Sequence, residues 1–211
     1  MHLEINKHDL VELVERQLQN LFSYNQTLEG YLLRAGVDRA VRACEYCFQH
    51  MGTRYYKREG VVYFNPFHSG QYCTFLYFLS REVYQIAGPV ILADRIYYLN
   101  KALNGVDLFY EVELPKIFLL DHPVGSVMGR ADYGDYFQFS QNCTVGNNHS
   151  SYPKLGERVT MMSGAKVVGA SVVGNDVVLS ANCYVKDAHI PNKTLVFGSS
   201  PDLILKPKQG D

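Results

Sequence analysis

The chain has 211 residues, of which 47% are apolar and 13% aromatic, so it is long and apolar enough to bury a core. Its 20 basic and 21 acidic residues leave a net charge of −1, which excludes the broad basic surface of proteins that bind nucleic acid or anionic membranes. No apolar run approaches the roughly 20 residues of a membrane span and the first residues lack the apolar core of a signal peptide, so we expect a cytoplasmic protein that acts on a small molecule.

The first part of the chain predicts a helical domain over residues 1–104. An amphipathic helix is indicated by apolar residues at helical spacing: Leu10, Leu13, Val14, Leu18, Leu21 and Phe22. Further helices are predicted over residues 31–51, 71–86 and 91–103. Gly88-Pro89 separates the last two, and Asn104-Gly105 marks the end of the domain.

The five cysteines form no disulfide framework, and only Cys44-x-x-Cys47 has the spacing of a motif. This pair lies in a predicted helix, with no second Cys or His pair nearby to complete a zinc site. The two interpretations are a metal or redox role and ordinary buried thiols. We expect no metal.

The second half of the chain repeats every six residues. The first position of each hexad is aliphatic: Leu155, Met161, Val167, Val173, Leu179 and Val185. The fifth position is mostly small: Val159, Ala165, Ser171, Val177, Cys183 and His189. This pattern is typical of a triangular coil with one hexad per side, the aliphatic residue inside and the small one at the corner. It predicts an α+β protein with a left-handed parallel β-helix over residues 105–198; a sheet sandwich with chance periodicity is the alternative.

Upstream hexads continue the repeat. Their first positions are Leu108, Leu114, Leu120, Val127, Tyr133, Phe139 and Val145, and their fifth positions are Val112, Phe118, Val124, Ala131, Phe137 and Cys143. The register slips by one residue near Ser126. The spacing from Val145 to Leu155 is about four residues longer than the six that would keep the phase, so a loop is expected to leave the coil at about residues 147–154. Loops on a rigid scaffold often carry functional residues. His189 is interpreted as structural, and residues 199–211 as a C-terminal tail.

Three motifs carry a resemblance to a known family. Asp107 and Asp121-His122 stand at the separation that serine acetyltransferases show between an Asp at the start of the coil and an Asp-His pair. Ser163-Gly164-Ala165-Lys166 resembles their Gly-Ala-Gly-Ala-Lys coil, and Pro153-Lys154-Leu155 the Pro-Lys-Ile that closes their active-site loop. The chain therefore resembles the serine acetyltransferases, which also place a helical domain before the β-helix, and the resemblance implies acetyl transfer from acetyl-CoA.

The resemblance also implies catalytic roles. His122 would be the general base that takes the proton of an acceptor hydroxyl, Asp107 its partner on the imidazole, and Asp121 would face the acceptor. A hydroxyl attacks a thioester poorly until such a base accepts its proton. Donors for the oxyanion are expected from backbone N–H groups around Gly146 or Asn147. The alternative for His122 is a coil histidine that only faces solvent.

The expected loop departs from the family. Serine acetyltransferases have Arg-His directly before Pro-Lys-Ile, and that Arg would hold the carboxylate of serine; here Ser150, Ser151 and Tyr152 precede Pro153. The loss of a bidentate carboxylate clamp argues against serine as the acceptor. Tyr152 offers an aromatic face with a hydroxyl, and His149 either contacts the acceptor or is only solvated.

An aromatic and polar stretch in the helical domain holds Tyr63, Phe64, Asn65, Phe67 and His68. Flat aromatic faces beside polar groups suit a sugar, whereas the same residues would also suit packing between the two domains. His68, His149 and Tyr152 are therefore the acceptor-binding candidates besides Asp121.

For the donor, the resemblance implies that pantetheine lies between coils of neighbouring subunits, against small residues such as Ser163, Gly164 and Ala181. Lys206 and Lys208 would meet the phosphates, or are simply solvated. The implied assembly is a homotrimer, with a dimer of trimers as the larger alternative. Residues 208–211 lack the terminal Ile by which the family docks onto an enzyme of cysteine synthesis, so no cysteine synthase complex is expected.

These observations predict an acetyl-CoA-dependent O-acetyltransferase with a sugar or glycan precursor as acceptor, which would place it in polysaccharide biosynthesis. Serine is the second acceptor and an amine, such as an amino sugar, the third. The rival outside the enzymes is a non-catalytic trimeric β-helix scaffold. A scaffold has no need for Asp107 and His122 at a separation that brings them onto neighbouring coils.

Overall fold

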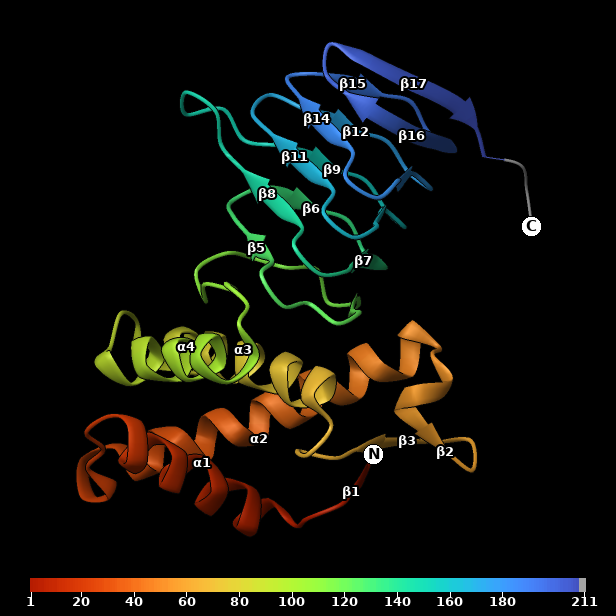
Figure 1. The fold of residues 1–211 in the computed structure, drawn as a ribbon. Helices are drawn as coiled ribbons and strands as arrows, with labels where there is room; N and C mark the ends of the chain where they lie inside the picture. Colours follow the sequence, from red (N-terminus) through yellow and green to blue (C-terminus); the bar gives the residue numbers. More distant parts are fainter. Residues whose placement is uncertain (209–211) are drawn as a thin grey trace. The chain divides into compact units, whose positions relative to one another are not determined.

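The computed structural model describes residues 1–208. The chain divides into two structural units, one of Met1–Asn104 with Phe109–Glu111 and one of Gly105–Leu108 with the chain from Val112 onward. Figure 1 shows the helical character of the first and the coiled strands of the second. Residues 209–211, on which the prediction about cysteine synthase docking partly rests, lie outside the described residues.

The N-terminal unit is built on four α-helices and one 3-10 turn: α1 (Lys7–Leu21), α2 (Gln26–Met51), η1 (Arg54–Tyr56), α3 (Ser69–Ala87) and α4 (Ile91–Asn104). The predicted helices are confirmed, although α2 begins five residues before the predicted residue 31. It begins there because the side chain of Asn25 accepts hydrogen bonds from the backbone N–H groups of Thr27 and Leu28. It ends at Gly52, whose φ of 69° is the left-handed conformation that favours glycine at a helix end.

The core of this unit centres on α3, which is buried along most of its length. Gly36 of α2 lies against α3, since a Cβ there would stand 2.8 Å from Val83 Cγ2. Cys44 and Cys47 are fully buried on α2, and burial and the neighbouring Cys47 raise the pKa of the Cys44 thiol. The pair is therefore part of the packed core, as the second interpretation proposed.

Sequence periodicity missed three short strands in this unit: β1 (His2–Leu3), β2 (Lys57–Arg58) and β3 (Val61–Phe64). They form one sheet with β3 between β1, which is parallel, and β2, which is antiparallel. Tyr63 and Phe64 of the aromatic stretch are 8% and 1% exposed. The Phe64 ring lies 5.4 Å from that of Phe75, and the Arg58 guanidinium lies 4.1 Å from the centre of the Tyr63 ring. These two side chains therefore pack inside the N-terminal unit.

The second unit is a parallel β-helix with three sides. The first side stacks β5 (Val127–Met128), β8 (Thr144–Gly146), β11 (Lys166–Val168) and β14 (Tyr184–Lys186). The second stacks β6 (Asp132–Tyr133), β9 (Lys154–Leu155), β12 (Val172–Val173) and β15 (His189–Ile190). The third stacks β4 (Phe118–Leu120), β7 (Phe137–Phe139), β10 (Thr160–Met161), β13 (Val178–Leu179) and β16 (Thr194–Ser199).

The end of the coil differs from the rest. The segment assigned to a tail contains strand β17 (Asp202–Pro207), which folds back antiparallel on β16. At the other end, a parallel bridge between Asp107 and Val127 begins the first side. None of the helices within residues 1–208 is long and apolar enough to cross a membrane.

The interior of the coil follows the predicted aliphatic column. Met161 lies opposite Leu179, and Val167 opposite Val185, in parallel register, and all four are 0% exposed. Successive coils therefore place one inward aliphatic side chain above the next, and each side chain shields the one in the neighbouring coil from solvent. A helical domain followed by a parallel β-helix is confirmed.

Three positions of the predicted register are wrong. Val127 is 41% exposed and Met128, which pairs with Val145, is the inward residue. Val124 is 62% exposed, because the chain between β4 and β5 forms a wider corner. His189 is exposed on β15 opposite Val172, and Ile190 takes the inward place, because this coil is one residue shorter than the hexad rule predicts.

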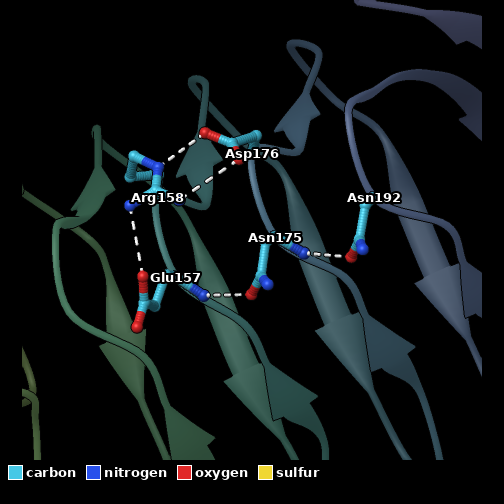
Figure 2. A network of polar contacts seen from close by, with 5 residues as sticks. All are labelled: Glu157, Arg158, Asn175, Asp176 and Asn192. Atoms are coloured by element: carbon cyan, nitrogen blue, oxygen red, sulfur yellow. Dashed lines mark hydrogen bonds and ion pairs between the residues drawn. The ribbon is translucent and has the colours of Figure 1, made fainter.

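A ladder of polar contacts holds the corner between the second and third sides, here called the ladder edge (Figure 2). Asn175 Oδ1 accepts the backbone N–H of Glu157 at 2.8 Å, and Asn192 Oδ1 accepts that of Asn175 at 2.7 Å. Beside them Arg158 Nε lies 2.6 Å from Asp176 Oδ1, and this pairing lowers the pKa of Asp176. Side chains of each coil thus satisfy backbone donors of the coil before it.

Candidate active site

His122 lies two residues after the end of β4, at the corner between the third and first sides, here called the His122 edge. Its φ of 50° and a bond from the Val124 N–H to its carbonyl oxygen at 2.8 Å define a tight turn that ends at Gly125. The His122 side chain is 89% exposed, and its Nε2 lies 3.8 Å from Asp121 Oδ1. The turn therefore presents an imidazole to solvent with a carboxylate beside it, which is a suitable arrangement for a general base.

Asp107 occupies the preceding coil at the same edge. Its N–H donates to the Ser126 carbonyl at 2.9 Å, and its own carbonyl accepts the Met128 N–H at 3.1 Å. Gly125 N–H donates to the Gly105 carbonyl at 2.8 Å. The segment that carries Asp107 therefore runs beside the segment that follows His122, while the role of the Asp107 carboxylate on the ring stays a prediction.

The expected loop leaves the coil between β8 and β9, at the corner between the first and second sides, here called the loop edge (Figure 1). Asn148 and Ser151 exchange two backbone hydrogen bonds of 3.0 and 2.9 Å. His149 and Ser150 between them have φ of 45° and 64°, as a type I′ turn requires. The loop is therefore an ordered hairpin. It leaves His149 exposed at its tip and Tyr152 45% exposed at its base.

The predicted oxyanion donors lie where this loop begins. Gly146 is the last residue of β8, and no atom lies within 4 Å of the place where a Cβ would stand. Asn147 is exposed. The backbone here is therefore open to the close approach of another molecule.

The predicted donor-site residues lie on the His122 edge in later coils. Ser163 and Gly164 follow β10, and Ala181, which is exposed, follows β13. Lys166 Nζ donates to the Gly164 carbonyl at 2.9 Å. Lys206 lies on β17, with Nζ 5.5 Å from the centre of the Phe197 ring. Ser163, Gly164 and Ala181 thus share an edge with His122, whereas Lys206 belongs to the terminal hairpin.

His68 lies in the N-terminal unit, where it caps α3. Its Nδ1 accepts the backbone N–H of Gln71 at 3.3 Å, so one ring nitrogen is engaged by the helix. Within residues 1–208, no group of three or more His, Cys, Asp or Glu side chains could hold a metal ion.

The structure also reveals a residue that sequence reasoning missed. Asp187, at the loop edge after β14, accepts hydrogen bonds from Ala170 N–H and from Asn148 Nδ2, each at 2.8 Å. A signal was present in the sequence, because an Asp at a corner that needs positive φ is a frequent local anchor. Its partner Asn148 could not be identified without the register of the loop.

Comparison with known proteins assigns the family. No protein-family model matches the chain. It is 30% identical to a serine acetyltransferase of Helicobacter pylori over 124 residues, which cover 53% of this chain and 72% of the relative. The chain belongs to the serine acetyltransferase family. A family member from Synechococcus elongatus is 31% identical over 125 residues, or 57% of this chain and 50% of that relative.

Solved structures of the family share the fold. A serine acetyltransferase in complex with cysteine superposes with a TM-score of 0.70 at 17% identity, covering 98% of this chain and 81% of that one. Isoform 3 from Entamoeba histolytica, also with cysteine, gives 0.65 at 23% identity, covering 94% and 73%. Both the helical domain and the β-helix thus have counterparts in the family. As a member of it, the protein is an acyltransferase that uses acetyl-CoA as donor.

Proposed function

We propose that the protein O-acetylates a small hydroxyl compound with His122 as the general base. The imidazole takes the proton of the acceptor hydroxyl, and the oxygen forms a bond to the carbonyl carbon of acetyl-CoA. The C–S bond then breaks, and the imidazolium returns the proton to the CoA thiolate. The observation that carries this proposal is the exposed His122 ring beside the Asp121 carboxylate.

The remaining site residues would support this step. Asp121, at 3.8 Å from the ring, stabilises the imidazolium as it forms, and Asp107 on the adjoining segment orients the ring from the other side. Backbone N–H groups near Gly146 and Asn147 receive the oxyanion of the tetrahedral intermediate. Each of these roles requires the acyl carbon to lie between the His122 edge and a loop edge.

The separation of these two edges supports a homotrimer. His122 and the loop of one chain stand at different corners of the triangle, separated by the first side, whose six residues span at most about 20 Å. A threefold assembly would place the His122 edge of one chain against the loop edge of its neighbour. The small residues Ser163, Gly164 and Ala181 would then leave room for the pantetheine arm of CoA in the same groove.

L-Serine is the first acceptor that we propose, because the relatives that share the sequence and the fold are serine acetyltransferases. A sugar hydroxyl is the second candidate, and the loop favours it. Ser150, Ser151 and Tyr152 precede Pro153 where the family has its carboxylate-binding Arg. Tyr152 is 45% exposed, so its ring and hydroxyl are available to a pyranose.

The test is release of CoA from acetyl-CoA in the presence of L-serine, nucleotide sugars, simple hexoses or an amino sugar. The His122→Ala variant serves as the catalytic control, and gel filtration reports its assembly. We expect His122→Ala to lower kcat by about 10²- to 10⁴-fold while the variant still binds acetyl-CoA. Turnover on a sugar with none on L-serine would show that the acceptor is a sugar and not serine. Wild-type turnover by a properly assembled His122→Ala enzyme would refute the base assignment.

A further inference from the structure

One carboxylate joins three successive strands of the first side at the loop edge. Asp187 follows β14, Ala170 follows β11, and Asn148 follows β8. Asp187 Oδ1 accepts the Ala170 N–H and Oδ2 accepts Asn148 Nδ2, each at 2.8 Å. Asn148 and Asp187 are 39 positions apart in the sequence, so this contact ties the loop to the corner that follows β14, two strands further along the first side.

The backbone is shaped to admit this carboxylate. Asp187 has φ of 49°, and Gly169 has φ of 71°. A Cβ at Gly169 would stand 2.0 Å from Asp187 Oδ1 and 2.9 Å from Asn148 Cβ. Only glycine therefore leaves room for both the carboxylate and the loop residue at this corner. The bond from the Ala170 N–H, followed by the Asn148 amide and the charges of Lys186 and His149, lowers the pKa of Asp187.

The residue that Asp187 holds is the first residue of the hairpin. Asn148 and Ser151 close the turn with reciprocal backbone bonds, so the position of Asn148 sets that of His149 at the tip. The same turn leads directly into Tyr152. Fixing Asn148 therefore restricts both loop side chains that are acceptor-binding candidates.

We propose that Asp187 is a positioning residue that holds the acceptor loop in place through Asn148. The inference rests on the proposed function for its kinetic consequence, since it assigns the hairpin to the acceptor. Its structural part, the anchoring of the hairpin, is independent of the reaction. In this role Asp187 acts through Asn148, which accounts for its classification as a positioning residue and not a catalytic one.

The matched control is Asp176 at the ladder edge (Figure 2). It also has positive φ, 58°, and also carries a lowered pKa, which its pairing with Arg158 causes first. Its contacts join corner residues only and reach no loop. A purely structural effect of removing a corner carboxylate would therefore appear equally in Asp176→Ala and Asp187→Ala.

The experiment combines hydrogen exchange with steady-state kinetics on the full chain. Asp187→Ala and Asn148→Ala should each accelerate amide exchange in residues 147–153 and raise the acceptor KM by about tenfold. The KM for acetyl-CoA and the melting temperature should stay close to wild type. The double variant should be no worse than either single variant, because both remove the same contact. Asp187→Glu, which keeps the charge, should restore part of the acceptor affinity.

Three results would overturn the inference. The first is unchanged exchange in residues 147–153 of Asp187→Ala, which would show that the hairpin does not depend on this anchor, whichever acceptor the enzyme uses. The second is faster exchange with an unchanged acceptor KM. The third is an equal rise of the acceptor KM in Asp176→Ala. Failure of the wild-type enzyme to acetylate any acceptor would instead count against the proposed function, and the exchange measurement would still decide the anchor.

Discussion

The carboxylate of Asp121 lies 3.8 Å from Nε2 of His122, and both side chains are more exposed than buried. We therefore expect Asp121→Asn to lower kcat by about tenfold, because a neutral amide no longer stabilises the imidazolium that forms as the acceptor loses its proton. Steady-state kinetics with saturating acetyl-CoA measure the effect. The control is Asp38→Asn on α2, a surface carboxylate paired with Lys7 at 2.8 Å. Equal kcat values for the two variants would contradict the role of Asp121.

The resemblance in the loop implies that Ser151 takes the place of the Arg that would hold the carboxylate of serine in the family. If the family chemistry is otherwise intact, Ser151→Arg should lower the KM for L-serine by about tenfold, because a guanidinium holds a carboxylate with two hydrogen bonds. Ser151→Lys is the matched control, since it adds the same charge without the planar fork. An equal fall in KM with both variants would point to charge alone. No change with either would show that the hairpin does not face the acceptor carboxylate.

Loop side chains should act on the acceptor and not on the donor. Tyr152→Phe removes only the phenolic hydroxyl, and we expect it to raise the KM of a sugar acceptor about five- to tenfold, as the loss of one hydrogen bond predicts. The KM of acetyl-CoA should not change. The ring itself is tested by Tyr152→Ala. A larger effect of Tyr152→Ala than of Tyr152→Phe on a sugar, with none on serine, would favour the sugar as acceptor.

The sequence determines the interior of the β-helix more securely than its corners. The column from Leu155 to Val185 is clear because one phase holds over six consecutive hexads. Val127 and Met128 are both apolar, so the pattern alone cannot decide which points inward, and the coil that ends at Ile190 is one residue short. A six-residue rule carries no information on such deletions. The structure resolves them through strand register.

The candidate site, too, is only partly predictable from the sequence. Asp107, Asp121 and His122 can be named as candidates from the sequence because their separation along the chain is itself the motif. The contact between Asn148 and Asp187 crosses 39 positions and an inserted loop, so it depends on how many residues leave the coil. The strands β1 and β3 were missed because two to four residues are too few for a periodicity to appear.

The reactivity of the cysteine thiols tests how well they are buried in the cores of the helical unit and of the β-helix. The five cysteines are all buried, and burial raises the pKa of Cys73 to about 12 and that of Cys183 to about 11. At pH 8 only about one Cys183 thiol in a thousand would be the reactive thiolate. We expect no reaction of the native protein with a chromogenic disulfide at pH 8, and reaction of all cysteines in guanidinium. Rapid labelling of Cys44 or Cys47 in the native protein would revive a redox role for that pair.

Adjacent valines on β12 test the stability of the coil. Val173 is 2% exposed and lies in the inward column, whereas Val172 is 40% exposed on the outer face of the same strand. Val173→Ala should lower the free energy of unfolding by about 2 kcal/mol, since it removes buried methyl groups and leaves a cavity between Leu155 and Ile190. Val172→Ala removes the same atoms from a partly solvated surface and should cost about 0.5 kcal/mol or less. Chemical denaturation followed by circular dichroism compares the two. Equal losses would mean that the inward column does not dominate the stability of this side.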